Sequence, residues 1–314
     1  MPAGGRKRVH RHQRRRSRVR DRGRGGDAAV SEDVHPHSDR LDAMSTQEVV
    51  QLMHAEDRRA VEAVAPHLDR IAAAIDAIAS RVRAGGNLHY FGAGTSGRIA
   101  ELDAAEVAPT FGVDAVRAHA AGDGAAEDDA DLGMSDSRAA GLTAGDAVVG
   151  VSASGRTAYV LAAMKEARAK GAMVVGFSCA TNTPLGELAD VAIEIETGPE
   201  VIAGSTRLKS GTVQKVVLNM ISTGVFVRLG HTYRGRMTGV VAANAKLHRR
   251  AVKLIHDLTG VPPADAEMTL VAANGSAKAA VLMLRCTLSA DEAAARLHEH
   301  NGDLAAALGE RTRA

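Results

Sequence analysis

The sequence is poor in aromatic residues: it has no Trp, and Phe, Trp and Tyr together make up 2% of its 314 residues. Hydrophobic residues nevertheless amount to 45% of the chain, which is enough for a packed core. That core must therefore be aliphatic, built from Ala, Val, Leu, Ile and Met. The length allows one large domain or two modest ones.

Long apolar segments are also lacking. No run of about 18 apolar residues is present, which argues against a transmembrane helix. No apolar h-region follows the basic N-terminus, which argues against a secretory signal. The two cysteines, Cys179 and Cys286, are far apart, and neither has a Cys or His at metal-ligand spacing. This usage is typical of buried free thiols in a reducing compartment, so we expect a cytoplasmic protein.

Charge is distributed unevenly along the chain. Residues 1–25 hold eleven Lys or Arg and one Asp, so a total of +2 leaves about −8 for the rest. A mildly acidic remainder argues against a surface that binds nucleic acid. Residues 1–36, which are rich in Arg and Gly, are expected to be a disordered basic tail. A solvated tail, or a start codon assigned too far upstream, is favoured over a nucleic-acid-binding arm.

Two helices are predicted at the start of the folded sequence, which we expect near Leu41. Ser45 and Glu48 have the spacing of a capping box. A second helix is predicted over 61–82, where apolar residues recur at three- and four-residue spacing, and Gly85-Gly86 should end it.

From Asn87 onward, short apolar runs alternate with helical segments. Strands are predicted at 88–91, 113–116, 147–151, 173–177 and 191–195. Helices are predicted to begin at about Ser96, Thr157, Pro184 and Gly211. The alternation predicts an α/β fold with a doubly wound parallel sheet, helices on both faces and a ligand crevice at the carboxyl ends of the strands.

After Asn244 the strand pattern disappears, and only helical segments are predicted. They lie at 245–258, 263–273, 276–284, 290–298 and 303–308. The sequence therefore predicts three parts, namely the tail (1–36), a sheet domain with N-terminal helices (37–243) and a small helical module (244–314). Packing, dimerisation or a lid is the preferred role of the module.

A first glycine-rich turn, Gly94-Thr95-Ser96-Gly97, follows the strand predicted at 88–91. Its backbone N–H groups and the helix start that follows suit an anionic ligand. It is not a Walker loop, because no Gly-Lys-Ser/Thr follows. Gly92, Gly94 and Gly97 approach a dinucleotide fingerprint only loosely, although Asp114 could supply the acidic residue. The Thr-Ser insertion favours direct hydroxyl contacts with a sugar or phosphate.

A second turn repeats the theme after the strand at 147–151. Ser152, Ser154 and Thr157 place three hydroxyls between the end of that strand and the start of a helix. Three hydroxyls and the nearby N–H groups could ring a phosphate. Helix capping explains one of the hydroxyls but not all three, so phosphate binding is favoured.

Two carboxylates and one cationic segment complete the candidates. Glu106 follows Gly97 by nine residues on an apolar helix, which Pro109 should end. Two interpretations of Glu106 remain equal: it is a buried general acid with a raised pKa, or it is an exposed charge on the helix. Glu127 lies in an acidic run that is normally solvated. The segment containing Ser205 and Lys209 either binds an anionic or sugar ligand or is a solvated N-cap loop.

Together these motifs resemble one family, the N-acetylmuramic acid 6-phosphate etherases, which are sugar isomerase (SIS) domain proteins. The resemblance runs from about Leu41 to the C-terminus. It is carried by residues 91–98, 102–106, 109–112, 153–157, 204–212, 218–220 and 300–302.

The resemblance implies cleavage of the lactyl ether of N-acetylmuramic acid 6-phosphate into N-acetylglucosamine 6-phosphate and D-lactate, in cell-wall sugar recycling. It implies elimination followed by water addition, with Glu106 as proton donor to the lactate oxygen and Glu127 as the base at C2. The implied substrate-binding residues are Gly94, Thr95, Ser96, Ser152, Ser154, Thr157, Ser205 and Lys209. It implies no metal or organic cofactor, no nucleic acid and no membrane, and it suggests a homodimer with the site completed across the interface.

Some positions depart from the family pattern. The segment between Glu106 and Glu127 is shorter than usual, and Gly239 and Ala245 stand where acidic residues are usual. A non-catalytic phosphosugar-binding regulator with the same domain is the main alternative. An aldose–ketose isomerase is the third, and the lactyl-specific motifs argue against it.

Overall fold

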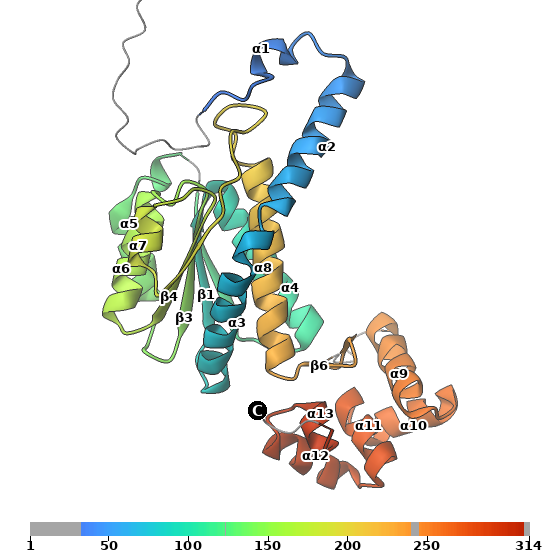
Figure 1. Ribbon diagram of the computed structural model, residues 1–314. Helices are drawn as coiled ribbons and strands as arrows, with labels where there is room; N and C mark the ends of the chain where they lie inside the picture. The colour runs from blue at the N-terminus through green and yellow to red at the C-terminus, as the bar shows by residue number, and fades with distance from the viewer. Residues whose placement is uncertain (1–32, 123, 240–244, 311–314) are drawn as a thin grey trace, which may run out of the picture.

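The computed structural model describes residues 33–122, 124–239 and 245–310. Its centre is a five-stranded parallel sheet covered by helices on both faces, and a helical module lies beyond one end of the sheet (Figure 1). The expected tail at 1–36 falls mostly outside the described residues. The last part of it does not, because His35 is buried and its Nε2 lies 3.5 Å from Glu56 Oε2. Described structure thus begins earlier than the expected Leu41.

The sheet has the strand order β2-β1-β3-β4-β5, and every neighbouring pair is parallel. The strands are β1 (Leu88–Ala93), β2 (Val116–Ala121), β3 (Ala147–Ser152), β4 (Met173–Ser178) and β5 (Val191–Glu194). All residues of β1, β3 and β4 are buried, as expected for parallel strands covered on both faces. In the register, Gly92 of β1 lies opposite Val151 of β3.

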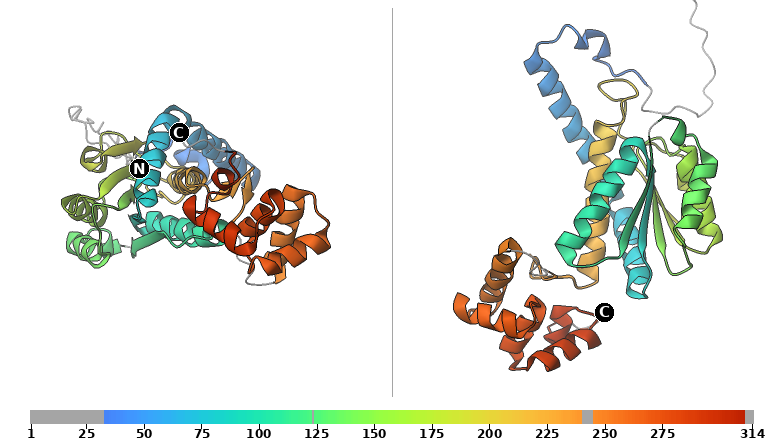
Figure 2. Two further views of the ribbon diagram at one scale, coloured as in Figure 1. Left: turned by 90° about the horizontal axis from the view of Figure 1, so that it is seen from below. Right: turned by 180° about the vertical axis from the view of Figure 1, so that it is seen from behind.

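Two sets of helices cover the two faces (Figures 1 and 2). One face carries α3 (Leu68–Arg83), α4 (Gly94–Phe111) and α8 (Lys209–Arg228); the other carries α5 (Ala130–Ala139), α6 (Ala158–Ala169) and α7 (Pro184–Leu188). The predicted doubly wound α/β architecture is therefore confirmed. The cores on both faces are largely aliphatic, and Tyr90, Phe91, Tyr159, Phe177 and Phe226 are the large rings among their fully buried side chains.

Two boundaries around α4 were predicted wrongly. The helix does not end at Pro109 but continues to Phe111, and Gly112 closes it in the left-handed conformation with φ +69°. The chain then needs 113–115 to return to the sheet, so the second strand is Val116–Ala121 and not the apolar run 113–116. That strand lies at the sheet edge and alternates Ala with Arg117 and His119. A search for apolar runs in the sequence therefore does not find it.

The N-terminal helices are α1 (Ser38–Leu41) and α2 (Thr46–Glu62), and the capping box of Ser45 and Glu48 is present as predicted. The helix predicted over 61–82 is wrong in its first part. A short 3-10 turn, η2 (Ala65–His67), contains Pro66 and separates α2 from α3. α2 therefore extends past the carboxyl ends of the strands, as Figure 1 shows.

A hairpin of β6 (Thr232–Tyr233) and β7 (Arg236–Met237), which the sequence did not predict, links α8 to the C-terminal helices. The five helices predicted after Asn244 are present as α9 (Ala245–Thr259), α10 (Pro263–Ala272), α11 (Ala277–Cys286), α12 (Ala290–Glu299) and α13 (Leu304–Ala307). They enclose their own buried cluster, centred on Ile255, Leu282 and Leu304. Among the described helices, none is long and apolar enough to cross a membrane.

Candidate functional site

The strand order places a crevice between the carboxyl ends of β1 and β3. The connection after β1 leads outward to β2, whereas the connection after β3 leads the other way to β4. Helices α4 and α6 therefore leave from opposite faces, and the ends of β1 and β3 are the topological switch point where open α/β sheets bind ligands. The two hydroxyl-rich turns follow these two strands, so the N-termini of α4 and α6 both lie at this switch point.

In the first turn, helix α4 begins immediately after β1. Gly94 has φ +54°, and Thr95 is half-buried. A Cβ added at Gly97 would lie 2.9 Å from the Gly92 carbonyl oxygen, so the glycine allows the helix to start against the strand. Ser96 is 7% exposed, and its Oγ accepts a hydrogen bond of 3.0 Å from Gln214 Nε2 of α8. Gln214 was not predicted to belong to the site.

In the second turn, the three hydroxyls gather around Ser152. Its Oγ lies 2.8 Å from Thr157 Oγ1 and 3.4 Å from Ser154 Oγ, and it accepts a hydrogen bond of 3.0 Å from Gly155 N. Thr157 occupies the N-cap position of α6, yet its side chain makes no capping hydrogen bond. Capping by Thr157 therefore does not explain this cluster, in which the hydroxyl of Ser152 contacts those of Ser154 and Thr157.

Glu127 lies beside the second turn despite the shortened segment before it. Its backbone oxygen accepts a hydrogen bond of 3.1 Å from the N–H of Tyr159, in the first turn of α6. The side chain is half-buried. The solvated acidic run expected from composition thus describes Asp128 and Asp129, which are exposed, better than it describes Glu127.

Glu106 lies far from both turns within its own chain. It follows Gly94 by twelve residues on α4, which is about 18 Å along the helix axis. The helix runs from the carboxyl end of the sheet toward the amino end (Figure 1). The side chain is exposed, so the apolar surroundings predicted from the sequence are absent in the single chain.

The cationic segment before α8 is bound largely by carboxylates of the same chain. The backbone N–H groups of Lys209 and Ser210 each donate a hydrogen bond of 3.0 Å to the buried carboxylate of Glu200. The ammonium of Lys209 is buried and lies 3.0 Å from Glu56 Oε2 of α2. Ser205 is half-buried in the preceding loop. The N-terminus of α8 therefore already binds an internal anion.

The ion pair of Glu56 and Lys209 ties α2 to α8. Burial by itself raises the pKa of Glu56, but the hydrogen bond from Lys209 and the electrostatic effects of Lys209, Arg59 and His35 outweigh burial and lower this pKa. Glu56 is thus a carboxylate at neutral pH. A solvated cation at position 209 is not what the structure shows.

Asp103, part of the 102–106 motif, fastens α4 in place. It is buried and accepts hydrogen bonds of 3.0 Å from the Tyr90 hydroxyl and 3.2 Å from Ser222 Oγ, while Lys215 Nζ lies 3.7 Å away. Burial raises the pKa of Asp103, and these partners oppose the rise. The carboxyl group therefore connects β1, α4 and α8 behind the first turn.

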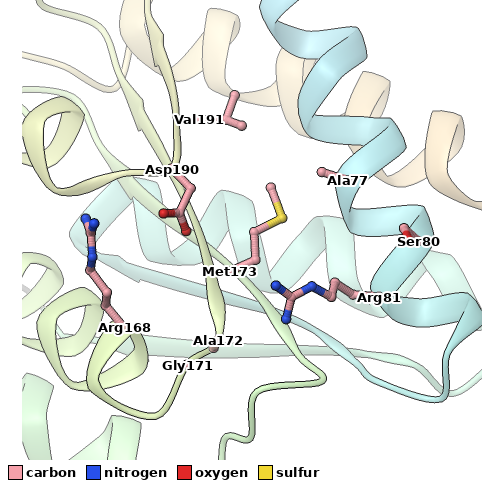
Figure 3. A pocket seen from close by; sticks show the side chains of 9 residues that line it. All are labelled: Ala77, Ser80, Arg81, Arg168, Gly171, Ala172, Met173, Asp190 and Val191. Atoms are coloured by element: carbon pink, nitrogen blue, oxygen red, sulfur yellow. The ribbon is translucent and has the colours of Figure 1, made fainter.

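Two cavities lie elsewhere. A cavity of about 600 Å³ between α3 and the amino ends of β4 and β5 is lined by Arg81, Arg168 and Asp190 (Figure 3). Another, of about 590 Å³, lies at the amino ends of β1 and β2 and is lined by His89 and His119 among others. Neither is lined by residues of the two turns. Within the described ranges, no group of three or more His, Cys, Asp or Glu side chains is arranged to hold a metal ion.

Comparisons with known proteins agree with this geometry. The model of the SIS domain family matches residues 84–223. The chain is 48% identical over 291 residues to an N-acetylmuramic acid 6-phosphate etherase of Rubrobacter xylanophilus, covering 90% of this chain and 96% of that protein. It is 44% identical over 292 residues to the protein of the same name from Mycolicibacterium smegmatis, covering 90% and 98%.

Solved structures resemble the chain more distantly. A putative phosphosugar isomerase involved in capsule formation from Bacteroides fragilis superposes with a TM-score of 0.47 at 21% identity, over 59% of this chain and 91% of that chain.

The parallel sheet, the crevice at its switch point and the matching domain model define a SIS-domain protein. Relatives that are 44–48% identical over about 90% of the chain identify one family within this class. The chain belongs to the family of N-acetylmuramic acid 6-phosphate etherases, and is an enzyme of the carbon–oxygen lyase type.

Proposed function

We propose that this enzyme cleaves the D-lactyl ether of N-acetylmuramic acid 6-phosphate, releasing N-acetylglucosamine 6-phosphate and D-lactate in the recycling of cell-wall amino sugars. The observation that carries the proposal is the family membership over about 90% of the chain. The convergence of two hydroxyl-rich helix N-termini at one crevice supports it independently, because such an arrangement suits a phosphate.

The phosphate would bind between the starts of α4 and α6. Helix N-termini attract anions through their free N–H groups and their dipoles. In the first turn, Gly94, Thr95 and Ser96 would supply N–H and hydroxyl donors. In the second, the donors would be the hydroxyls of Ser152, Ser154 and Thr157. Ser205 and Lys209 line the approach from α8 in this proposal, Lys209 through its ion pair with Glu56.

The reaction needs one base and one acid. In the open-chain sugar, the C1 aldehyde acidifies the C2 proton, and Glu127 would remove it. The electron pair left on C2 then forms the C2–C3 double bond as the C3–oxygen bond breaks, and Glu106 gives its proton to the departing lactate oxygen. Water then adds its oxygen to C3 and gives a proton to Glu106, while Glu127 returns its proton to C2, so that both carboxyl groups recover their starting states. Each such proton transfer contributes about 10²–10⁴-fold.

The position of Glu106 leads us to propose a homodimer. Within one chain it lies about 18 Å along α4 from the first turn. Leu102, one turn away on the same helix, is 50% exposed, and Met220 and Val227 of the adjacent α8 are also exposed. Exposed apolar side chains on two adjacent helices fit a protein interface better than open solvent. In the proposed dimer, Glu106 of one protomer completes the crevice of its partner.

The assay that tests the function measures D-lactate release from N-acetylmuramic acid 6-phosphate. We expect turnover by the wild type and a loss of about 10²–10⁴-fold in Glu106→Gln. Glu101→Gln, which alters an exposed carboxylate on the same helix, is the matched control and should remain active. Binding without turnover by the wild type would instead favour a phosphosugar-binding regulator.

Mixing two inactive variants tests the shared site. Glu106→Gln and Glu127→Gln should each be nearly inactive alone. If the two carboxylates of one site come from different chains, a mixed dimer contains one site with both intact, and activity returns on coexpression. If they come from the same chain, every site keeps one substitution and no activity returns, which would contradict the proposed arrangement.

We also propose that the enzyme works in the cytoplasm. The free cysteines Cys179 and Cys286 support this, because protein thiols stay reduced there. Fractionation of the native host with a D-lactate assay would check it, and activity confined to an extracellular fraction would contradict it.

A further inference from the structure

The hydroxyl of Ser96 is held from outside its own turn. Its partner is Gln214, which lies on α8 and is 118 positions away in the sequence. Gln214 is 1% exposed, and its Nε2 lies 3.0 Å from Ser96 Oγ. Among the described residues, this is the hydrogen bond that the Ser96 hydroxyl makes.

The direction of this hydrogen bond leaves the serine proton for another acceptor. An amide nitrogen only donates, so the Ser96 oxygen accepts and its own O–H is not consumed. Ser96 lies in the first turn of α4, where the backbone N–H groups have no partner within the helix. A hydroxyl oriented as a donor beside those groups suits an anionic oxygen.

The two turns therefore orient their hydroxyls by different means. In the second turn, Ser152, Ser154 and Thr157 contact one another within one loop. In the first turn, the corresponding constraint comes from α8. The N-terminus of that helix is itself held by the carboxylate of Glu200 and by the ion pair of Lys209 with Glu56 of α2.

We propose that Gln214 is a positioning residue for the phosphate site: it holds Ser96 so that the hydroxyl proton points to a phosphate bound at the N-terminus of α4. The proposal deepens the function argued above and rests on it. Gln214 acts through Ser96 and does not itself touch the reacting atoms.

A double-mutant cycle tests this. Gln214→Met keeps most of the buried volume and removes the donor. We expect Gln214→Met to raise both the KM for N-acetylmuramic acid 6-phosphate and the Kd for N-acetylglucosamine 6-phosphate by about 10-fold, while kcat changes little. The factor follows from the usual strength of a hydrogen bond to a charged group. In a Ser96→Ala background, the same substitution should have almost no further effect on either constant.

Two further variants separate positioning from general loosening. Ser222→Ala removes another buried hydrogen bond between α8 and α4, and it should lower thermal stability without changing KM. Gln214→Glu replaces the donor by an acceptor, so that Ser96 must donate its proton to position 214. We therefore expect this variant to bind the phosphosugar more weakly still than Gln214→Met.

The outcomes distinguish this inference from the proposed function. If the wild type binds N-acetylglucosamine 6-phosphate and the cycle shows coupling, but no D-lactate is released, the positioning role stands and the reaction assignment fails. If the wild type is active and Gln214→Met and Gln214→Glu both bind as tightly as the wild type, the positioning role is overturned. Additive effects of Gln214→Met and Ser96→Ala would also overturn it. A wild type that neither binds nor reacts would remove both.

Discussion

The two ends of the parallel sheet differ in the helix ends that face them. At the carboxyl end, α4, α6 and α8 begin; hydroxyl-rich turns precede or open α4 and α6, and the N-terminus of α8 binds an internal carboxylate. At the amino end, α3 and α6 finish, and two open cavities of about 600 and 590 Å³ lie there. Both of these cavities lie away from the turns that can bind an anion. The direction of the helices marks the candidate site.

The imidazoles of His89 and His119 show the opposite character of the amino end. His89 Nδ1 lies 3.1 Å from His119 Nε2, and the rings are stacked. Burial is the main cause that lowers the pKa of His89 to about 4, and the neighbouring His119 lowers it further. The buried imidazole of His89 is therefore neutral at neutral pH, and its substitution should not alter substrate binding.

The largest effect is expected at the carboxyl end from Glu127→Gln. Removal of the base at C2 should lower kcat by about 10²–10⁴-fold and slow the exchange of the C2 proton with solvent. Asp128→Asn, at the exposed neighbouring position, is the control and should leave kcat unchanged. Proton exchange followed by NMR in deuterated water checks this, and undiminished exchange in Glu127→Gln would mean that another group is the base.

The second effect concerns the hydroxyls of the second turn. We expect the double substitution Ser154→Ala and Thr157→Ala to raise KM by about 10- to 100-fold with little change in kcat, because it removes two donors to a charged phosphate. Ser80→Ala, which removes an exposed hydroxyl beside the cavity of Figure 3, should leave KM unchanged. Equal KM values for both variants would erase the distinction between the two ends.

The third effect separates backbone conformation from packing in the second turn. Gly155 has φ +66°, and a Cβ there would lie 2.5–2.7 Å from atoms of the buried Thr183 side chain. Gly155→Ala should lower the free energy of unfolding by about 2–4 kcal/mol through strain and overpacking. Gly141 has the same φ but open space, so Gly141→Ala should cost only about 1–2 kcal/mol. Urea denaturation measures both, and equal losses would remove the packing contribution.

The smallest effect belongs to the amino end and depends on pH. The pKa of His89 is about 4 in the folded protein against 6.5 ordinarily, so the unfolded chain binds more protons between these values. Stability from this group is complete above pH 6.5 and is lost as the pH falls toward 4, by about 2 kcal/mol at pH 5. His89→Gln should reduce that acid-dependent loss and leave KM unchanged. Denaturation midpoints at pH 5 and 7 measure it; an unaltered difference would exclude His89 as the source.

The sequence determined the fold class because the alternation of apolar runs with amphipathic segments is local. It determined the two hydroxyl-rich turns for the same reason, since Ser152, Ser154 and Thr157 lie within six residues. The predicted end of α4 was wrong because a local pattern does not show where the chain turns back to the sheet. The helix continues through Pro109, and the return begins at Gly112. The bounds of the edge strand β2 were predicted wrongly because its pairing with β1, and not its apolar content, makes it a strand.

Only the tertiary structure decided which residues surround the turns. Gln214 reaches Ser96, and Glu56 reaches Lys209, across more than a hundred positions, and no spacing in the sequence predicts such contacts. The structure also places Glu106 on an exposed face although its neighbours in the sequence are apolar. A local pattern determines the backbone conformation of its own segment. The burial of a side chain and its bonding partners depend instead on which segments the tertiary structure brings together.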